Sequence, residues 1–272
     1  GSTAYGGQDV RASLDNPVEL ATPSGQTNVS PDVSSAVTIS EQQTTGFFAN
    51  YYIRSADVTS FVSTHGSNTY TVGGIPATES TFINSLNAGG WTLIVVYEEP
   101  SMPLRYLDVR VGGSFVNANQ SHDYVFGDIC TNPSEITPTK AVISAMEGDA
   151  DATGDELLLA ESSGDVFAPI LGANNPVDNF FASQINKSDG TLDTRGTFGD
   201  RNHDTSTGTN AAGARQGWDI TTMDLTSGLG FGWTSLTLRA TGTGDSYLPT
   251  SAGLQMDIPV PDITTTHSLT RA

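Results

Sequence analysis

The sequence of 272 residues has few basic side chains, and this scarcity limits the partners it can have. Lys and Arg together number 11 against 30 Asp and Glu, which gives a formal net charge of −19 at pH 7. A polyanion of this size repels phosphate backbones. The composition therefore argues against nucleic acid as a partner, and it favours divalent cations and solubility at high ionic strength.

Cysteine and long apolar runs are also nearly absent. Cys130 is the only cysteine, so no internal disulfide can form, and we expect its side chain to be buried as a small apolar group. No apolar run approaches the roughly 20 residues that cross a bilayer, so we expect no membrane span in this chain. No signal peptide is recognisable, but Gly1-Ser2 resembles a cloning remnant, so the lack of a signal peptide does not argue against secretion.

Short segments rich in β-branched and aromatic residues, separated by Gly and Pro, predict an all-β protein. The segment 91–97 is apolar on both faces, which predicts a central strand, with 104–111 as its partner. The segments 140–146 and 156–159 are expected to pair with each other. Further strands are predicted at 36–39, 47–53, 235–240 and 254–258. We therefore predict a jelly-roll-like β-sandwich with a few short helices in the connections.

The helices are expected at 55–62, where Ser55 is the N-cap and Gly66 lies just past the end, at 80–86, and at 175–181. The organisation predicted from these signals is an extended polar lead-in at 1–34, one sandwich domain at 35–258, and a linker at 259–272.

The sharpest chemical signal is an acidic loop between two predicted strands. Asp149, Asp151 and Thr153 alternate along the chain, Gly154 follows them, and Asp155 comes next, as in a D-x-D-x-[DN]-G calcium loop. A tight turn with Gly at its apex brings alternate side chains to one point, and Ca²⁺ requires six to eight oxygens. We therefore predict a calcium site in this loop.

Position 12 of this loop is Ala160 rather than Glu, so the loop is not an EF-hand, and Glu147 or a distant carboxylate would supply the bidentate ligand. The alternative is a solvated acidic hairpin turn. A second candidate site comprises Asp200, Asn202 and Asp204, but Thr205 stands where the Gly should be, which favours a polar surface loop.

No motif of an enzyme is present. The sequence has no G-x-S-x-G elbow, no P-loop and no dinucleotide-binding glycines. Glu98 and Glu99 are adjacent on a predicted strand, so they point to opposite faces, and we expect a structural role such as an ion pair with Arg105. Trp218 and Trp233 could form an aromatic platform for a ligand, although core aromatics are the more ordinary interpretation.

The run from Gly89 to Arg105, GGWTLIVVYEEPSMPLR, resembles the GGW-[ST]-L-[IV]-V-V-Y-E-[DE]-P stretch of an uncharacterised β-rich domain family. The family occurs in large secreted and cell-surface, adhesin-like proteins of bacteria, with relatives in archaea. Shorter similar pieces extend the resemblance over about residues 35–258. The chain departs from the family at 106–110, which lacks the family's Asp-Gly-Phe. The resemblance implies a cell-surface context and no catalytic residues.

The leading hypothesis is a calcium-stabilised, secreted structural or adhesive module of a cell-surface protein that is not an enzyme. Its partner would be a cell-surface glycan or protein, or neighbouring copies of itself. One alternative is a calcium-assisted module that binds carbohydrate or peptide through Trp218 and Trp233. Another is a secreted hydrolase that uses carboxylates of the acidic loops.

Overall fold

The structure is a computed structural model, and it describes residues 4–5, 8–44, 47–78, 89–132, 135–150, 152–162, 164, 166–194 and 217–258. The predicted helix at 80–86, the second candidate metal loop at 200–204 and Asp151 lie outside these residues.

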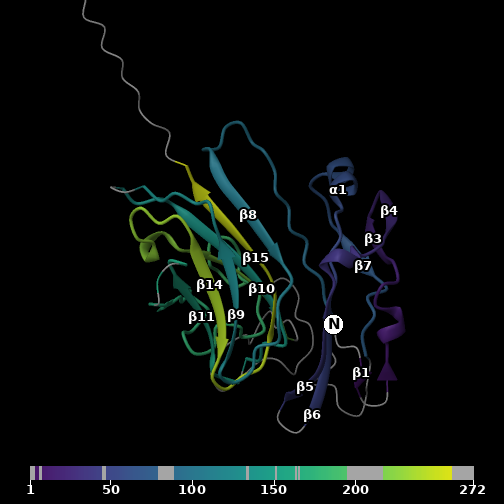
Figure 1. Cartoon of the computed structure of the whole chain (residues 1–272). Helices are drawn as coiled ribbons and strands as arrows, with labels where there is room; N and C mark the ends of the chain where they lie inside the picture. The colour runs from purple at the N-terminus through teal and green to yellow at the C-terminus, as the bar shows by residue number, and fades with distance from the viewer. Residues whose placement is uncertain are drawn as a thin grey trace, which may run out of the picture.

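Two four-stranded antiparallel sheets pack together as a β-sandwich, which confirms the predicted fold class (Figure 1). The strands are β8 (Arg105–Val111), β9 (Gln120–Phe126), β10 (Thr139–Met146), β11 (Asp155–Ala160), β12 (Ala168–Pro169), β13 (Trp218–Asp224), β14 (Leu236–Gly242) and β15 (Leu248–Asp257). One sheet has the order β13-β10-β15-β8 and the other β12-β11-β14-β9. Apart from β11 and β12, consecutive strands lie in opposite sheets, which is the order of a jelly roll. Connections therefore gather at the two ends of the sandwich.

The core lies between the two sheets and follows the period of two that a pleated strand imposes. In β11, Leu157 and Leu159 are buried, whereas Glu156 and Leu158, which point to the other face, are partly exposed. Phe126, Phe181 and Tyr247 are fully or almost fully buried in the same cluster. Burial of each such side chain stabilises the fold by roughly 1.5–3 kcal/mol, so this core holds the sheets together without a disulfide.

The N-terminal elements lie beside the sandwich (Figure 1). They are β1 (Ala4–Tyr5), β2 (Gln8–Asp9), η1 (Arg11–Ser13), β3 (Val18–Thr22), β4 (Gly25–Val29), η2 (Val33–Ser35), β5 (Val37–Thr44), β6 (Phe47–Ile53), α1 (Thr59–His65) and β7 (Thr71–Gly73). Strand β3 pairs with β4 and β7, and β5 pairs with β6. The β3–β4 hairpin falls within residues 1–34, where the sequence predicts an extended lead-in. The division of the chain into lead-in, domain and linker stays a prediction.

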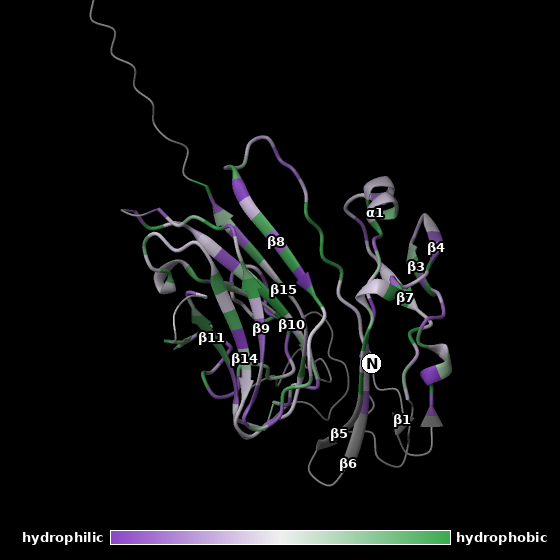
Figure 2. Ribbon diagram, in the orientation of Figure 1, coloured by the Kyte–Doolittle hydropathy of each residue, from purple (hydrophilic) through white to green (hydrophobic). Residues whose placement is uncertain are grey.

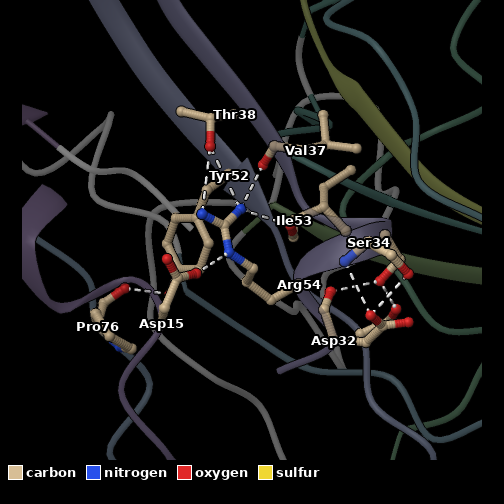
Figure 3. A network of polar contacts seen from close by, with 11 residues as sticks. Asp15, Asp32, Ser34, Val37, Thr38, Tyr52, Ile53, Arg54 and Pro76 are labelled. Carbon is tan, nitrogen blue, oxygen red and sulfur yellow. Dashed lines mark hydrogen bonds and ion pairs between the residues drawn. The ribbon is translucent and has the colours of Figure 1, made fainter. Parts of the chain in front are cut away.

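Arg54, directly after β6, ties these elements together (Figure 3). Its Nε donates to Asp15 Oδ1 at 2.7 Å, and its Nη1 donates to the carbonyl of Val37 at 2.8 Å. The guanidinium also lies 5.7 Å from the ring centroid of Tyr52. Because the planar guanidinium offers several donors in fixed directions, one side chain can fix the end of the β5–β6 hairpin against the segment before β3.

Helix α1 confirms the helix predicted after Ser55, with a later start. The carboxylate of Asp57 accepts from the N–H of Thr59 at 2.8 Å, so the first turn forms around Asp57 rather than Ser55. The helix ends at Gly66, whose φ of +58° suits glycine and whose N–H donates to the carbonyl of Val62 at 2.7 Å.

The prediction of a central strand at 91–97 is wrong. The segment is extended but joins no sheet, and Val95, Val96 and Tyr97 are 50%, 59% and 65% exposed. Figure 2 shows it as a hydrophobic stretch without a strand arrow between β8 and the N-terminal elements. It lines a cavity of about 860 Å³ there. An apolar segment becomes a central strand only when strands flank it, and β8 pairs instead with β15.

Three further expectations are also corrected. Residues 175–181 form turns rather than a helix, because the Asn175 amide donates to the carbonyl of Phe180 at 2.8 Å and closes the loop.

Strands β10 and β11 do not pair with each other, contrary to the prediction. They lie in opposite sheets, so the acidic loop crosses from one sheet to the other. Cys130 is exposed rather than buried. A last helical turn, η3 (Thr226–Gly228), follows β13.

Candidate cation site

Carboxylates from both sheets gather at one end of the sandwich. We call them the carboxylate cluster, and its members are Glu147, Asp149, Asp155, Asp219 and Asp245. Each interacts electrostatically with at least one other member. The cluster thus brings together acidic side chains that are up to about a hundred positions apart in the chain.

The strand ends position these side chains. Asp155 is the first residue of β11, and Asp219 is the second residue of β13, opposite Ala145 of β10. Glu147 and Asp149 follow the end of β10, and Asp245 lies in the connection between β14 and β15. Because a jelly roll brings connections from both sheets to the same end, the fold itself concentrates these residues there.

One oxygen of the Asp219 carboxylate accepts hydrogen bonds, and the other has no partner among the described residues. The side chain is 1% exposed, and its Oδ1 accepts from the N–H of Gln184 at 2.8 Å. The N–H of Ser183 also hydrogen-bonds to Asp219, and Ser183 has a φ of +58°, so consecutive amides turn toward the carboxylate as in an anion-binding nest. Oδ2 has no hydrogen-bond partner among the described residues.

In Asp155 and Asp245, too, one carboxylate oxygen accepts a hydrogen bond and the other does not. Asp155 is fully buried, its Oδ2 accepts from the N–H of Phe181 at 2.7 Å, and its Oδ1 has no partner in the described structure. Asp245 is 8% exposed, its Oδ1 accepts from the N–H of Ser246 at 2.6 Å, and its Oδ2 has no such partner. The carbonyl oxygen of the Asn179 side chain is likewise buried and unpartnered, and Asn179 forms a β-bridge with Asp155.

Burial raises the pKa of the carboxyls in this cluster. It raises the pKa of Asp155 to about 7 and that of Asp245 to about 8, and Asp149 and Asp155 raise the latter further by their charge. Burial also raises the pKa of Glu147 and that of Asp219 well above their usual range. No cation is among the groups that shift any of these pKa values. Buried carboxylates without a cationic partner are costly, and a bound proton or metal ion relieves that cost.

The fit to a metal ion is partial. Within the described part of the chain, no three His, Cys, Asp or Glu side chains are placed so that they could hold one ion. The unpartnered oxygens of Asp155, Asp219, Asp245 and Asn179 are nevertheless of the kind that Ca²⁺ prefers. A Ca²⁺ ion held here would have to draw these oxygens closer together than they lie in the structure, with neutral oxygens completing its shell.

Gly148 shows how closely the oxygens approach at this point. A Cβ atom on Gly148 would lie 2.2 Å from the carbonyl oxygen of Phe181 and 2.5 Å from Oδ2 of Asp219. The two oxygens therefore border the same small space, and only glycine leaves it open.

The predicted calcium loop contributes part of this cluster. The structure brings Glu147, Asp149 and Asp155 together, places Thr153 at the surface, and does not describe Asp151. Sequence reasoning missed Asp219, Asp245 and Asn179 as partners of this loop. Their spacing carries no signal, because only the pairing of the strands brings them near Asp155.

The two tryptophans proposed as a ligand platform do not share one surface. Trp218 lies opposite Met146 at the end of β10 and packs on the apolar cluster there. Trp233 hydrogen-bonds through its main chain with Thr131 and packs on the main core, beyond the other end of β13. A strand of seven residues spans roughly 20 Å, so these indoles are too far apart to hold one sugar ring between them.

The paired glutamates have a local role. Glu98 and Glu99 are exposed, and Glu99 accepts from the N–H and the hydroxyl of Ser101. The ion pair with Arg105 is not formed, because Arg105 Nε donates to Asp257 Oδ1 at 2.8 Å. Asp257 lies opposite Arg105 in the β8–β15 ladder and is therefore the nearer partner.

No family model and no curated protein matches this sequence. Among solved structures, the chain is similar to one described as "Structure of infectious bursal disease virus Gx strain", with 12% sequence identity and a TM-score of 0.22. The alignment covers 89% of this chain and 55% of that chain. A similarity this low carries no argument about function. No helix in the described residues is long and apolar enough to cross a membrane.

Proposed function

We propose that this chain is a calcium-stabilised extracellular module of a cell-surface protein with a structural or adhesive role, and that it is not an enzyme. The observation that carries the proposal is the set of buried, unpartnered carboxylate oxygens on Asp155, Asp219 and Asp245. A cation bound among them would hold the connections of both sheets at one point and so stabilise the end of the sandwich.

The chemistry of the donors favours calcium over other metals. Every group in the carboxylate cluster offers oxygen, whereas zinc prefers nitrogen and sulfur ligands. Mg²⁺ demands near-ideal octahedral geometry, whereas Ca²⁺ accepts six to eight oxygens in flexible arrangements that include neutral side-chain and main-chain oxygens. Ligands that come from connections of unequal length form an irregular coordination shell more easily than a regular octahedral one.

The extracellular setting rests on one physical argument and two observations of the sequence. Sites in extracellular modules bind Ca²⁺ with dissociation constants of about 10⁻⁴–10⁻³ M, so they are filled outside cells and not in the cytosol. The net charge of −19 suits a surface exposed to salt. The resemblance of residues 89–105 to adhesin-like surface proteins agrees with both. The partner would then be a cell-surface glycan or protein, or a neighbouring copy of the chain.

Thermal unfolding of the full chain tests the proposal. The midpoint is measured in millimolar Ca²⁺, in the same concentration of Mg²⁺, and in chelator, at one ionic strength. A site filled to 100 times its dissociation constant adds about 2.7 kcal/mol to the unfolding free energy, so we expect a clear rise in Ca²⁺ and a smaller one in Mg²⁺. Equal midpoints in all three solutions would remove the metal from the proposed function.

A further inference from the structure

Tyr51 of β6 connects the N-terminal hairpin to the end of the sandwich that bears the carboxylate cluster. Its side chain is fully buried, and its ring stacks on that of Phe115 with centroids 5.3 Å apart and planes 15° apart. Both rings belong to an apolar cluster with Met146 and Leu248, the residues where β10 ends and β15 begins. Tyr51 therefore packs on the sandwich as well as on Ile53, Val37 and Ile39 of its own hairpin.

The hydroxyl of Tyr51 is the unusual part of this contact. It is buried and has no hydrogen-bond partner among the described residues. Besides burial, the groups that raise the pKa of Tyr51 are Glu147, Asp149 and Asp245, all members of the carboxylate cluster. The packing of the Tyr51 ring on Met146 places it beside Glu147, the next residue in the chain. A buried hydroxyl that is left unpaired there is unfavourable.

We propose that the β5–β6 hairpin forms part of the cation site, with the Tyr51 hydroxyl donating a hydrogen bond to a carboxylate that holds the ion. This inference rests on the proposed function. Carboxylates that bind metals are commonly held in orientation by a second hydrogen-bond donor. Tyr51 is then a positioning residue, because it orients a ligand and does not touch the ion.

The arrangement couples ion binding to the docking of the hairpin. When the cation is bound, the carboxylates are ionised, and an ionised carboxylate is the stronger acceptor for the Tyr51 hydroxyl. Because such coupling is reciprocal, a docked hairpin strengthens ion binding and a bound ion strengthens docking by the same factor. The N-terminal elements would be held firmly in calcium and loosely without it.

The test combines calorimetry with hydrogen exchange on the full chain, and Ca²⁺ alone is the probe. Tyr51→Phe keeps the stacked ring and removes only the hydroxyl. Tyr52→Phe is the matched control, because the neighbouring hydroxyl donates to the carbonyl of Pro76, away from the cluster. We expect Tyr51→Phe to weaken Ca²⁺ binding about three- to tenfold and Tyr52→Phe to leave it unchanged. In the unmodified chain, Ca²⁺ should slow amide exchange in residues 50–53 as well as in 147–155, and Tyr51→Phe should lose the protection of 50–53.

Failure of either expectation overturns the inference. If Tyr51→Phe binds Ca²⁺ as tightly as the unmodified chain, or if Ca²⁺ protects 147–155 and leaves 50–53 unchanged, the hairpin is not part of the site, although the proposed function stands. If calorimetry detects no Ca²⁺ binding to the unmodified chain, the proposed function fails as well, and the two outcomes are thereby distinguished.

Discussion

The main-chain N–H of Phe181 donates to Oδ2 of Asp155 at 2.7 Å, while Oδ1 of the same buried carboxylate has no hydrogen-bond partner in the described structure. Asp219 is divided in the same way between the amide of Gln184 and a free Oδ2. One oxygen of each carboxylate thus fixes a loop, and the other remains available to a ligand. A substitution that keeps the first oxygen and removes the charge therefore tests binding without removing the loop contact.

The substitution Asp219→Asn tests ligand binding while it keeps the loop contact. The asparagine keeps an oxygen to accept from the amides of residues 183 and 184, and it removes a buried carboxyl that is costly to ionise without a cation. In chelator we expect the variant to unfold at the same temperature as the unmodified chain or higher, because a carboxyl that is costly to ionise is gone. In millimolar Ca²⁺ we expect it to lose at least half of the calcium-dependent rise. Calorimetry of both proteins in both solutions measures this.

Asp189→Asn is the matched control for that experiment. Asp189 is exposed and accepts from the N–H and hydroxyl of Thr191, contacts that asparagine can also make. It should respond to Ca²⁺ as the unmodified chain does. A full calcium-dependent rise in Asp219→Asn, equal to that of the control, would show that the ion binds elsewhere.

The pH dependence of stability in chelator should have an unusual sign for carboxyl groups. The folded pKa values of Asp155 and Asp245, about 7 and about 8, lie above the ordinary 3.8. The folded state therefore holds more protons than the unfolded state in this window, so the unfolding free energy falls as the pH rises. We expect denaturant unfolding in chelator to show lower stability at pH 8.5 than at pH 5.

Calcium should flatten this dependence, because the bound ion takes over the role of the protons. Unfolding at pH 5, 6.5 and 8.5 is compared with and without saturating Ca²⁺ at equal ionic strength, so that general repulsion within an acidic chain is the same in both series. An equal decline of the unfolding free energy in both series would mean that Ca²⁺ does not affect the protonation of the cluster.

Much of the fold follows from local sequence patterns. The strands at 105–111, 139–146, 155–160 and 236–242 fall where β-branched and apolar residues gather between turns, and α1 ends at the glycine that the sequence marks. Strand β15 begins at Leu248, six residues before the strand predicted at 254–258. Strands β9 and β13 were missed because polar residues alternate with few large apolar ones, as in Gln120–Phe126. What such patterns do not contain is the choice of neighbours, and for this reason β10 and β11 were wrongly paired.

The same limit applies to the candidate site. The alternation of oxygen-bearing residues at 149–155 indicates a loop that could bind a cation, and the structure does bring Asp149 and Asp155 into one cluster. Asp219 and Asp245 join them only because β13 pairs with β10 and the β14–β15 connection reaches the same end. These are long-range pairings, and no spacing within one segment encodes them.

Gly148→Ala should be strongly destabilising although it adds a single methyl group. The new Cβ would lie 2.2 Å from a main-chain oxygen of Phe181 and 2.5 Å from Asp219 Oδ2, and a main-chain atom cannot move aside as a flexible side chain can. Overpacking of this kind costs roughly 1–3 kcal/mol. Gly127→Ala is the control, because nothing lies within 4 Å of a Cβ there. Chemical denaturation gives both values, and equal stability of the two variants would contradict the packing described around Asp219.

The segment at 91–97 offers the sharpest contrast between sequence and structure. A central strand would bury Tyr97 or its neighbours, and replacing a buried aromatic residue by alanine costs roughly 3–5 kcal/mol. In the structure Tyr97 is 65% exposed, and the segment joins no sheet. We therefore expect Tyr97→Ala to change the unfolding free energy by less than about 0.5 kcal/mol. Phe126→Ala, which removes a fully buried ring from the main core, should show the full loss in the same denaturation experiment. A loss at Tyr97 as large as that at Phe126 would mean that the segment is packed as a strand after all.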